Sequence, residues 1–231
     1  APGRGSPYRH GLSSPAMMAR LEIRPLVIGA DGLVGRALAA RFEEEYPQAV
    51  TAGRTELDVT DRWRLEAEIE RLEPTVVINC AAVADVDLCE REPELAHRVN
   101  AAGPAHLAEA CRNARIRLIH FSTDYVFDGE KHGEYDECDA ANPLNVYGRS
   151  KLEGEMAVLE TLVDAVVLRV SFLFGPGRTT FLDKIAARAR APARPGRLLP
   201  KAGPDTVWAS ESLSPARVAV RCLSAGAPWP A

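Results

Sequence analysis

Thr123, Tyr147 and Lys151 are the side chains of this 231-residue chain whose types and spacing could do chemistry. Tyr147 and Lys151 stand four residues apart, so on a helix they share one face. A ketone that accepts a hydride must also accept a proton, and a phenol with a pKa of about 10 is a slow acid unless a nearby ammonium stabilises its phenolate. We therefore expect Lys151 to lower the pKa of Tyr147, and Thr123 to donate to the carbonyl oxygen.

The order of these residues along the chain makes the pattern more specific than a tyrosine and lysine pair, which is common on helices. A glycine-rich turn comes first, the apolar run RLIHFS then leads into Ser122 and Thr123, and Tyr147 follows 24 residues after Thr123. The combination predicts a carbonyl-reducing site in which a nicotinamide cofactor supplies the hydride. Lys151 would also hold the nicotinamide ribose.

The glycine-rich turn predicts where the cofactor's pyrophosphate lies. Gly29, Gly32 and Gly35 follow the first apolar run in GADGLVGRAL, and a helix is expected to open near Leu33. Glycines at this spacing let backbone amides approach a phosphate at a helix N-terminus, where the helix dipole favours negative charge. The alternative is a purely structural turn.

The second apolar run suggests which cofactor is preferred. A site for NAD usually places Asp or Glu after this strand, whereas TAGRTELD places Arg54 there. A guanidinium suits a 2′-phosphate, so we expect NADP, with NAD as the alternative cofactor and a solvated surface arginine as the alternative role. Asp58 and Val59 would border the adenine, unless Asp58 only caps the following helix.

The elements that must position these residues alternate along the chain. Short apolar runs (PLVIGA, AVTA, TVVINCAA, RLIHFS and AVVLRVSFLFG) are separated by helical patterns at 33–46, 61–73, 94–114 and around Tyr147 and Lys151. Continuous apolar strands between helices predict an α/β fold, a doubly wound parallel sheet with both faces covered. Its ligands should lie at the carboxyl ends of the strands.

The sequence resembles the extended short-chain dehydrogenase/reductase superfamily and, within it, the dTDP-4-dehydrorhamnose reductase family. The resemblance rests on STDYVFDG and PLNVYGRSKLEGE, together with NCAAVADVDLCE, VNAAGPAHLAEAC and LRVSFLFGPG, and covers about residues 25–184. It implies a Rossmann-type cofactor domain and reduction of the 4-keto group of dTDP-4-dehydro-L-rhamnose to dTDP-L-rhamnose by NADPH or NADH.

The resemblance also implies roles for individual residues. Thr123, Tyr147 and Lys151 would carry catalysis, and Asn100 would either support the helix behind the lysine through a water or lie on a helix surface. The cofactor would be lined by Gly29, Gly32, Leu33, Val34, Gly35, Arg54, Asp58, Val59, Ala81, Ala82, Tyr147 and Lys151. The nucleotide-sugar substrate would lie nearer Asp85, Val86, Asp128 and Phe172. The acidic segment 128–140 is expected to be a solvated lid edge.

The two ends of the chain depart from the family pattern. Residues 1–20 are rich in Gly, Pro, Ser and Arg and are expected to form a disordered leader, followed by the NAD(P)-binding domain at 21–186. From Ala187 the chain has seven prolines and no recognisable alternation of strands and helices. We expect residues 187–231 to be an atypical tail, a truncated or diverged form of the family's small substrate lobe.

Two other functions stay open from the sequence. SSDYVFDG and PLNLYGKTKLDGE in the regulatory β subunits of methionine adenosyltransferase are similar to the corresponding stretches here, which implies an NADP-binding, non-catalytic partner of another protein. A reductase or epimerase for another nucleotide sugar is the third reading. A 4,6-dehydratase is disfavoured, because Tyr125 stands where an Asp-Glu pair after the threonine would place its Glu.

Composition excludes several classes of protein. No apolar run approaches the roughly 18 to 20 residues of a membrane span and no signal-peptide core is present, so we expect a cytoplasmic protein, alone or as a homodimer. A net charge of −4 without a basic stripe disfavours nucleic acid. Five cysteines without a CxxC pair predict reduced thiols and no metal site. The dispersed histidines are expected to be ordinary surface or packing residues: His97, His106, His120 and His132.

Overall fold

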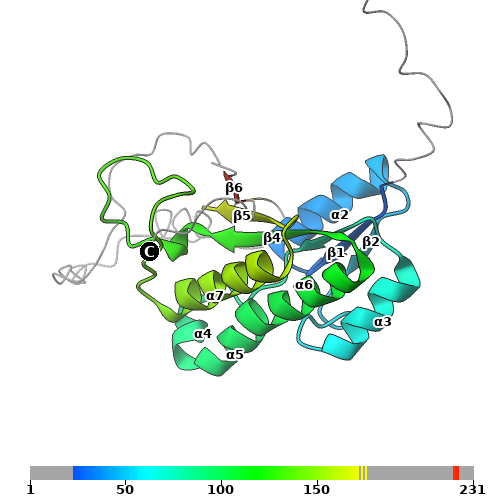
Figure 1. The fold of residues 1–231 in the computed structure, drawn as a ribbon, viewed down its shortest axis with the longest axis horizontal. Coiled ribbons are helices and arrows are strands. Elements are labelled where there is room, and N and C mark those ends of the chain that lie inside the picture. The colour runs from blue at the N-terminus through cyan, green and yellow to red at the C-terminus, as the bar shows by residue number, and fades with distance from the viewer. Residues whose placement is uncertain (1–22, 172, 174, 176–220, 224–231) are drawn as a thin grey trace, which may run out of the picture.

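Strands β2-β1-β3-β4-β5-β6, in that order, form the sheet at the centre of the molecule (Figure 1). The computed structural model describes residues 23–171, 173 and 175, and the backbone of 221–223. The parallel strands are β1 (Pro25–Ile28), β2 (Val50–Ala52), β3 (Val76–Asn79), β4 (Arg117–Thr123) and β5 (Val166–Val170), and β6 (Arg221–Leu223) runs antiparallel to β5.

The helices cover both faces of this sheet, as predicted. Helix α2 (Leu33–Glu45) lies on one face, and α3 (Arg62–Leu72), α6 (Gly103–Ala114) and α7 (Val146–Thr161) lie along the other (Figure 1). Two short helices, α4 (Val86–Arg91) and α5 (Pro93–His97), lead into α6. The sequence expectation of a doubly wound α/β fold is confirmed, with one antiparallel strand added at the edge.

The order of the strands reverses direction between β1 and β3, and this reversal positions the candidate site. The chain passes from β1 outward to β2, returns across the sheet to β3, and then continues in the other direction to β4 and β5. The loops after β1 and β3 therefore leave the sheet side by side at its carboxyl edge. A crevice at such a switch point is where ligands bind in open α/β sheets.

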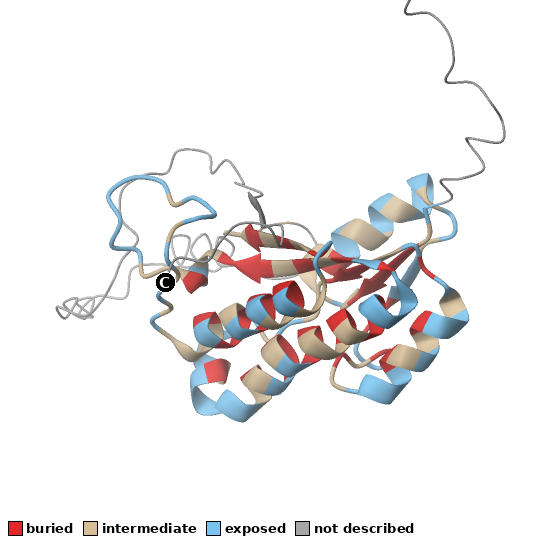
Figure 2. Ribbon diagram, viewed as in Figure 1, coloured by how far each residue is buried: buried red, intermediate tan, exposed pale blue. Residues whose placement is uncertain are grey.

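The hydrophobic core lies between the sheet and the layer of α3, α6 and α7 (Figure 2). Leu26 and Val77 on the central strands and Leu107 on α6 are fully buried. Each buried side chain of this size contributes about 1.5–3 kcal/mol relative to an exposed one. The central strands β1 and β3 are buried along almost their whole length, which explains why their sequences read as continuous apolar runs rather than alternating ones.

The helix predicted over 94–114 is interrupted by a π-helical turn, η1 (Arg98–Ala102). Pro104 has no backbone N–H, so the carbonyl of Asn100 loses the donor that a regular helix would supply. Helix α7 packs against this carbonyl through Gly154, where a Cβ would lie only 2.1 Å from the Asn100 oxygen. A glycine on α7 and a proline on α6 together let the two helices pack closely.

Both ends of the predicted NAD(P)-binding domain fall outside the described residues, as does the predicted leader. The boundaries at 20/21 and 186/187 therefore stay predictions. Strand β6 is the described part of the predicted tail, a region in which the sequence pattern predicts no element. Its three residues pair with Val167, Leu168 and Arg169 of β5, and a strand this short leaves almost no pattern in the sequence.

Candidate active site

The glycine-rich turn after β1 lies against the loop after β3. Gly29 has a φ of +83°, and a Cβ there would lie 2.5 Å from the backbone nitrogen of Ala81. A Cβ on Gly35 would lie 2.2 Å from the carbonyl oxygen of Gly29. These two glycines therefore allow the turn to fold tightly under the start of α2, which begins at Leu33 after Gly32. The first amides of a helix have no partner within it and suit a phosphate, so the turn fits a dinucleotide.

Arg54 and Asp58 follow β2, as predicted, and a residue that the sequence analysis missed joins them. The backbone N–H of Arg54 donates to Asp31 Oδ2 at 2.9 Å, while its guanidinium, 71% exposed, approaches Asp58 Oδ2 at 3.4 Å. Asp31 also lies against Gly53, where a Cβ would come within 2.3 Å of its carboxylate. The signal for Asp31 was its place inside the glycine-rich turn.

Asp58 does not cap the following helix, so that alternative is wrong. Asp61 is the N-cap of α3 and accepts from Arg64 N at 3.1 Å. Asp58 instead accepts from the backbone N–H and the hydroxyl of Thr60 at 2.9 and 2.8 Å. Burial acts to raise the pKa of Asp58, but these hydrogen bonds and the nearby Arg54 outweigh it and lower the pKa. Val59 is buried and packs against Gly103 at the start of α6.

The loop after β3 holds four predicted site residues in one segment. Ala81 is half-buried and Ala82 is exposed beside the glycine-rich turn. Asp85 caps α4 by accepting from Leu88 N at 2.9 Å, and Val86 is the first residue of that helix. Asp85 therefore has a local structural role in addition to the substrate role that the resemblance implies.

Thr123 and Tyr147 meet where β4 ends. Thr123 is the last residue of β4, and its hydroxyl lies close enough to Tyr147, in the first turn of α7, to act on the pKa of that phenol. Thr123 Oγ1 also donates to Asp124 Oδ1 at 3.1 Å. Gly148 makes this meeting possible, because a Cβ there would lie 2.2 Å from the carbonyl oxygen of Tyr125. The start of α7 can therefore approach the turn that follows β4.

Lys151 lies one turn further along α7, and its side chain is 1% exposed. Nζ donates to the carbonyl oxygen of Phe121 at 2.7 Å and lies 3.4 Å from His120 Nε2. Burial lowers the pKa of Lys151 to about 8, against the opposing influence of Glu155 and Cys80. The ammonium is thus directed at the end of β4.

The pKa expected for Tyr147 is wrong in its direction. Burial raises the pKa of Tyr147 to about 12, and the nearby Thr123 hydroxyl opposes this only in part. The charge of Lys151 was expected to set this pKa, but the removal of the phenol from water dominates it. Since burial disfavours the phenolate, the structure holds Tyr147 as a neutral phenol, the form that can donate a proton.

The comparisons with known proteins decide the family. The RmlD substrate binding domain matches residues 23–194. The chain belongs to the dTDP-4-dehydrorhamnose reductase family. A probable low-salt glycan biosynthesis reductase of Haloferax volcanii is 37% identical over 87% of this chain and 70% of its own length. The dTDP-4-dehydrorhamnose reductase of Streptomyces griseus is 42% identical over 70% of this chain and 54% of its own length.

Solved structures of this family have the same fold. A dTDP-4-dehydrorhamnose reductase from Bacillus anthracis, solved in complex with NADP, superposes with a TM-score of 0.70 at 31% identity over 73% of this chain and 60% of that one. One from Clostridium acetobutylicum gives a TM-score of 0.69 at 34% identity over 72% of this chain and 59% of that one. The chain therefore spans only about half to two-thirds of the length of most of these dTDP-4-dehydrorhamnose reductases.

In this member of the dTDP-4-dehydrorhamnose reductase family, a buried polar layer lies between the sheet and α7. Asn79, the last residue of β3, and His120, in the middle of β4, are fully buried, and Asn79 Nδ2 lies 3.0 Å from His120 Nδ1. The expectation that His120 is an ordinary packing residue missed these polar contacts. The sequence could have indicated these contacts, because Asn79 and His120 are polar residues inside the apolar runs TVVINCAA and RLIHFS.

A buried ion pair continues this layer. Arg169 on β5 donates to both carboxylate oxygens of Glu155 on α7 and also lies over the ring of Phe127 at 5.0 Å. Sequence reasoning assigned neither charged residue to the interior. Helix α7 is thus fixed to β5 by a charge pair directly behind Lys151.

Asn100 is buried, so the alternative of a helix-surface asparagine is wrong. It accepts from Val83 N at 2.9 Å and donates to Val83 O and to Ser150 Oγ, each at 3.0 Å. Ser150 in turn donates to the carbonyl oxygen of Tyr147 at 2.9 Å. Asn100 supports α7 next to Lys151 by direct contact.

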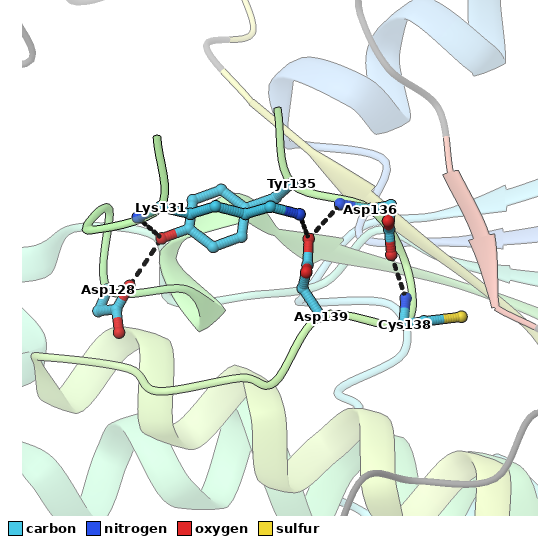
Figure 3. A network of polar contacts seen from close by, with 6 residues as sticks. All are labelled: Asp128, Lys131, Tyr135, Asp136, Cys138 and Asp139. Atoms are coloured by element: carbon cyan, nitrogen blue, oxygen red, sulfur yellow. Dashed lines mark hydrogen bonds and ion pairs between the residues drawn. The ribbon is translucent and has the colours of Figure 1, made fainter. Parts of the chain in front are cut away.

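Asp128 organises the loop that precedes α7 (Figure 3). It accepts from Tyr135 Oη at 2.6 Å, from Glu130 N at 3.0 Å and from Asn142 Nδ2 at 3.1 Å, and these contacts, the one from Tyr135 first, lower its pKa to about 2. The loop thus has internal structure rather than being only a solvated edge. Phe172, the other predicted substrate residue of this region, lies outside the described residues.

Two expected absences can be compared with the part of the chain that the structure describes. In residues 23–171, 173 and 175, no group of three or more His, Cys, Asp or Glu is placed to hold a metal ion. No helix within the described residues is both long and apolar enough to cross a membrane.

Proposed function

We propose that this chain catalyses the NADPH-dependent reduction of the 4-keto group of a nucleotide sugar, with dTDP-4-dehydro-L-rhamnose as substrate and dTDP-L-rhamnose as product. The observation that carries the proposal is that Thr123 ends β4 beside Tyr147 in the first turn of α7, and that Lys151 Nζ donates to Phe121 O of the same strand. The names of the family's characterised relatives support the same reaction. The sequence predicts the cytoplasm as its compartment.

The roles of the three residues follow from their surroundings. Tyr147, held as a neutral phenol, donates its proton to the oxygen of the substrate as the alkoxide forms. Thr123 donates a hydrogen bond to the same oxygen and orients the phenol. Lys151 in its charged form stabilises the phenolate that remains and binds the cofactor ribose. The cofactor, when bound, supplies the hydride.

The cofactor proposal is NADP, with NAD as the alternative. The tight turn at Gly29 and Gly35 leads into the first amides of α2, which suit a pyrophosphate, and a Cβ at either glycine would clash with backbone atoms. The exposed guanidinium of Arg54 is placed to meet a 2′-phosphate. The relative from Bacillus anthracis was solved with NADP, in keeping with this assignment.

We propose that the nucleotide sugar lies near Asp85, Val86 and Asp128, where the loop after β3 and the loop before α7 approach the catalytic residues, with Phe172 as a further contact. A homodimer and a regulatory partner stay predictions from the sequence, and neither is required by this reaction.

The test is NADPH oxidation followed at 340 nm with purified protein of verified intact mass. The proposal predicts oxidation that depends on dTDP-4-dehydrorhamnose and is absent without it. Binding of NADPH without turnover would refute the reductase and favour the regulatory alternative. Failure to bind NADPH would refute both.

A further inference from the structure

His120 is a fully buried imidazole that the proposed mechanism does not use, yet it lies beside the catalytic lysine. Its Nδ1 lies 3.0 Å from Asn79 Nδ2, and its Nε2 lies 3.4 Å from Lys151 Nζ. Burial and the nearby Lys151 lower its pKa well below the usual value, so the ring is neutral and carries one proton. The position of that proton decides what the ring presents to Lys151.

The neighbouring loop fixes the position of the proton. The backbone N–H of Ala81 can only donate, and it lies 3.0 Å from the Oδ1 of Asn79. Asn79 must therefore present its oxygen to Ala81 and its NH₂ group to His120. Since Asn79 Nδ2 donates, His120 Nδ1 must accept, and the single proton of the neutral ring is on Nε2.

This orientation has a consequence for Lys151. An ammonium at Nζ would place its hydrogens against the Nε2–H of His120, whereas a neutral amine can accept from Nε2–H and donate to the carbonyl oxygen of Phe121. The other groups that face Nζ are Cys80 from the end of β3 and Glu155 on α7, and the charge of Glu155 is paired with Arg169. The low pKa of Lys151 agrees with this arrangement.

We propose that Asn79 and His120 are positioning residues for Lys151: Asn79 holds His120 as the Nε2–H tautomer, and this tautomer favours the neutral amine of Lys151 and keeps it at the end of β4. The chain of contacts runs from Ala81, in the loop proposed to line the cofactor, through Asn79 and His120 to the lysine. The inference deepens the proposed function and rests on it for the role of Lys151. It predicts that His120 helps set the pH above which the charged lysine is lost.

The first test is the ¹⁵N NMR spectrum of the histidine rings in the whole wild-type chain, with the His120 signals assigned by their loss in His120→Phe. The proposal predicts a neutral ring with its proton on Nε2. A ring with its proton on Nδ1, or with both nitrogens protonated at neutral pH, would overturn it. This measurement needs no turnover, so it decides the inference even if the proposed reaction fails.

The second test reverses the tautomer with Asn79→Asp. A carboxylate can accept from Ala81 N and also from His120 Nδ1–H, which would leave Nε2 as an acceptor for the ammonium of Lys151. We expect the NMR signature to move to Nδ1–H, and the alkaline limb of the kcat pH profile to rise by about one unit, a tenfold change in the acidity constant. An unchanged tautomer in folded Asn79→Asp protein would contradict the proposal.

A double-mutant comparison separates this effect from the added charge. If the carboxylate introduced by Asn79→Asp acts through the ring, its influence on the alkaline limb disappears when the comparison is repeated in the His120→Phe background. If the new charge acts directly on Lys151, the shift persists in that background, and the positioning role of His120 is refuted. Should Asn79→Asp fail to fold, the wild-type spectrum still decides which tautomer is present.

Discussion

Glu155→Gln is the substitution whose cost to stability can be worked out most directly from the structure. Glu155 is fully buried and the Arg169 side chain is 6% exposed, and the Arg169 guanidinium donates to the carboxylate at 3.0, 3.1 and 2.6 Å. Glutamine keeps the volume and one acceptor oxygen, but it leaves the charge of Arg169 without a counterion.

Removing one partner of a buried ion pair costs about 3–5 kcal/mol, and the retained acceptor suggests the lower end, about 3 kcal/mol. This is a large part of the roughly 5–15 kcal/mol that stabilises a domain. The assay is urea unfolding, in which a slope of about 2 kcal/mol per molar converts the loss into a midpoint about 1.5 M lower.

Glu68→Gln is the matched control, because Glu68 forms an ion pair with Arg71 on the exposed surface of α3. We expect it to lower the free energy of unfolding far less than Glu155→Gln does, because water screens an exposed ion pair. If Glu155→Gln cost no more than Glu68→Gln, the reasoning about the buried pair would be refuted. Replacing both partners, Glu155→Leu with Arg169→Met, should recover most of the loss, since no unpaired charge remains.

Three further predictions address the cofactor turn, the lysine and the cofactor preference. Gly35→Ala places a Cβ 2.2 Å from the oxygen of Gly29, so NADPH affinity measured by fluorescence titration should fall at least tenfold; an unchanged affinity would contradict the role of the turn. The pKa of Lys151 is lowered from 10.5 to about 8 in the folded chain. Between these two pH values the unfolded chain keeps a proton on Lys151 that the folded chain has lost. The free energy of unfolding therefore rises with pH across that window, by roughly 3 kcal/mol in total. Lys151→Met should lack this rise. The prediction is contradicted if the difference in unfolding free energy between the wild type and Lys151→Met does not change with pH. Arg54→Ala should weaken NADPH binding about tenfold and leave NADH binding nearly unchanged, whereas equal losses for both cofactors would argue against a 2′-phosphate contact.

The sequence allowed the fold to be predicted, and Thr123, Tyr147 and Lys151 to be proposed as catalytic residues, because their signals are local. Apolar runs report the buried central strands, and Thr123, Tyr147 and Lys151 stand at the end of one strand and on one helix face. The glycines at 29 and 35 could be found in the same way, since a tight turn restricts residue type directly.

What the sequence did not reveal depends on contacts between distant segments. The pairing of Glu155 with Arg169 and the contact of Asn79 with His120 join different strands and helices, and neither has a characteristic spacing. The pKa of Tyr147 was predicted in the wrong direction because burial, which dominates it, is a property of the packed structure. The cap of α3 was ambiguous because Asp58 and Asp61 stand three residues apart, and only the backbone geometry selects between them.

The most direct test of the proposed reaction compares the wild-type chain with Tyr147→Phe in single-turnover oxidation of bound NADPH by dTDP-4-dehydrorhamnose. The phenylalanine keeps the ring, including its edge contact with Tyr125, but has no proton to donate. We predict a rate at least about 100-fold lower, because a positioned general acid contributes about that much or more, with an unchanged affinity for NADPH. Equal rates in the two proteins would contradict the assignment of Tyr147 as the proton donor.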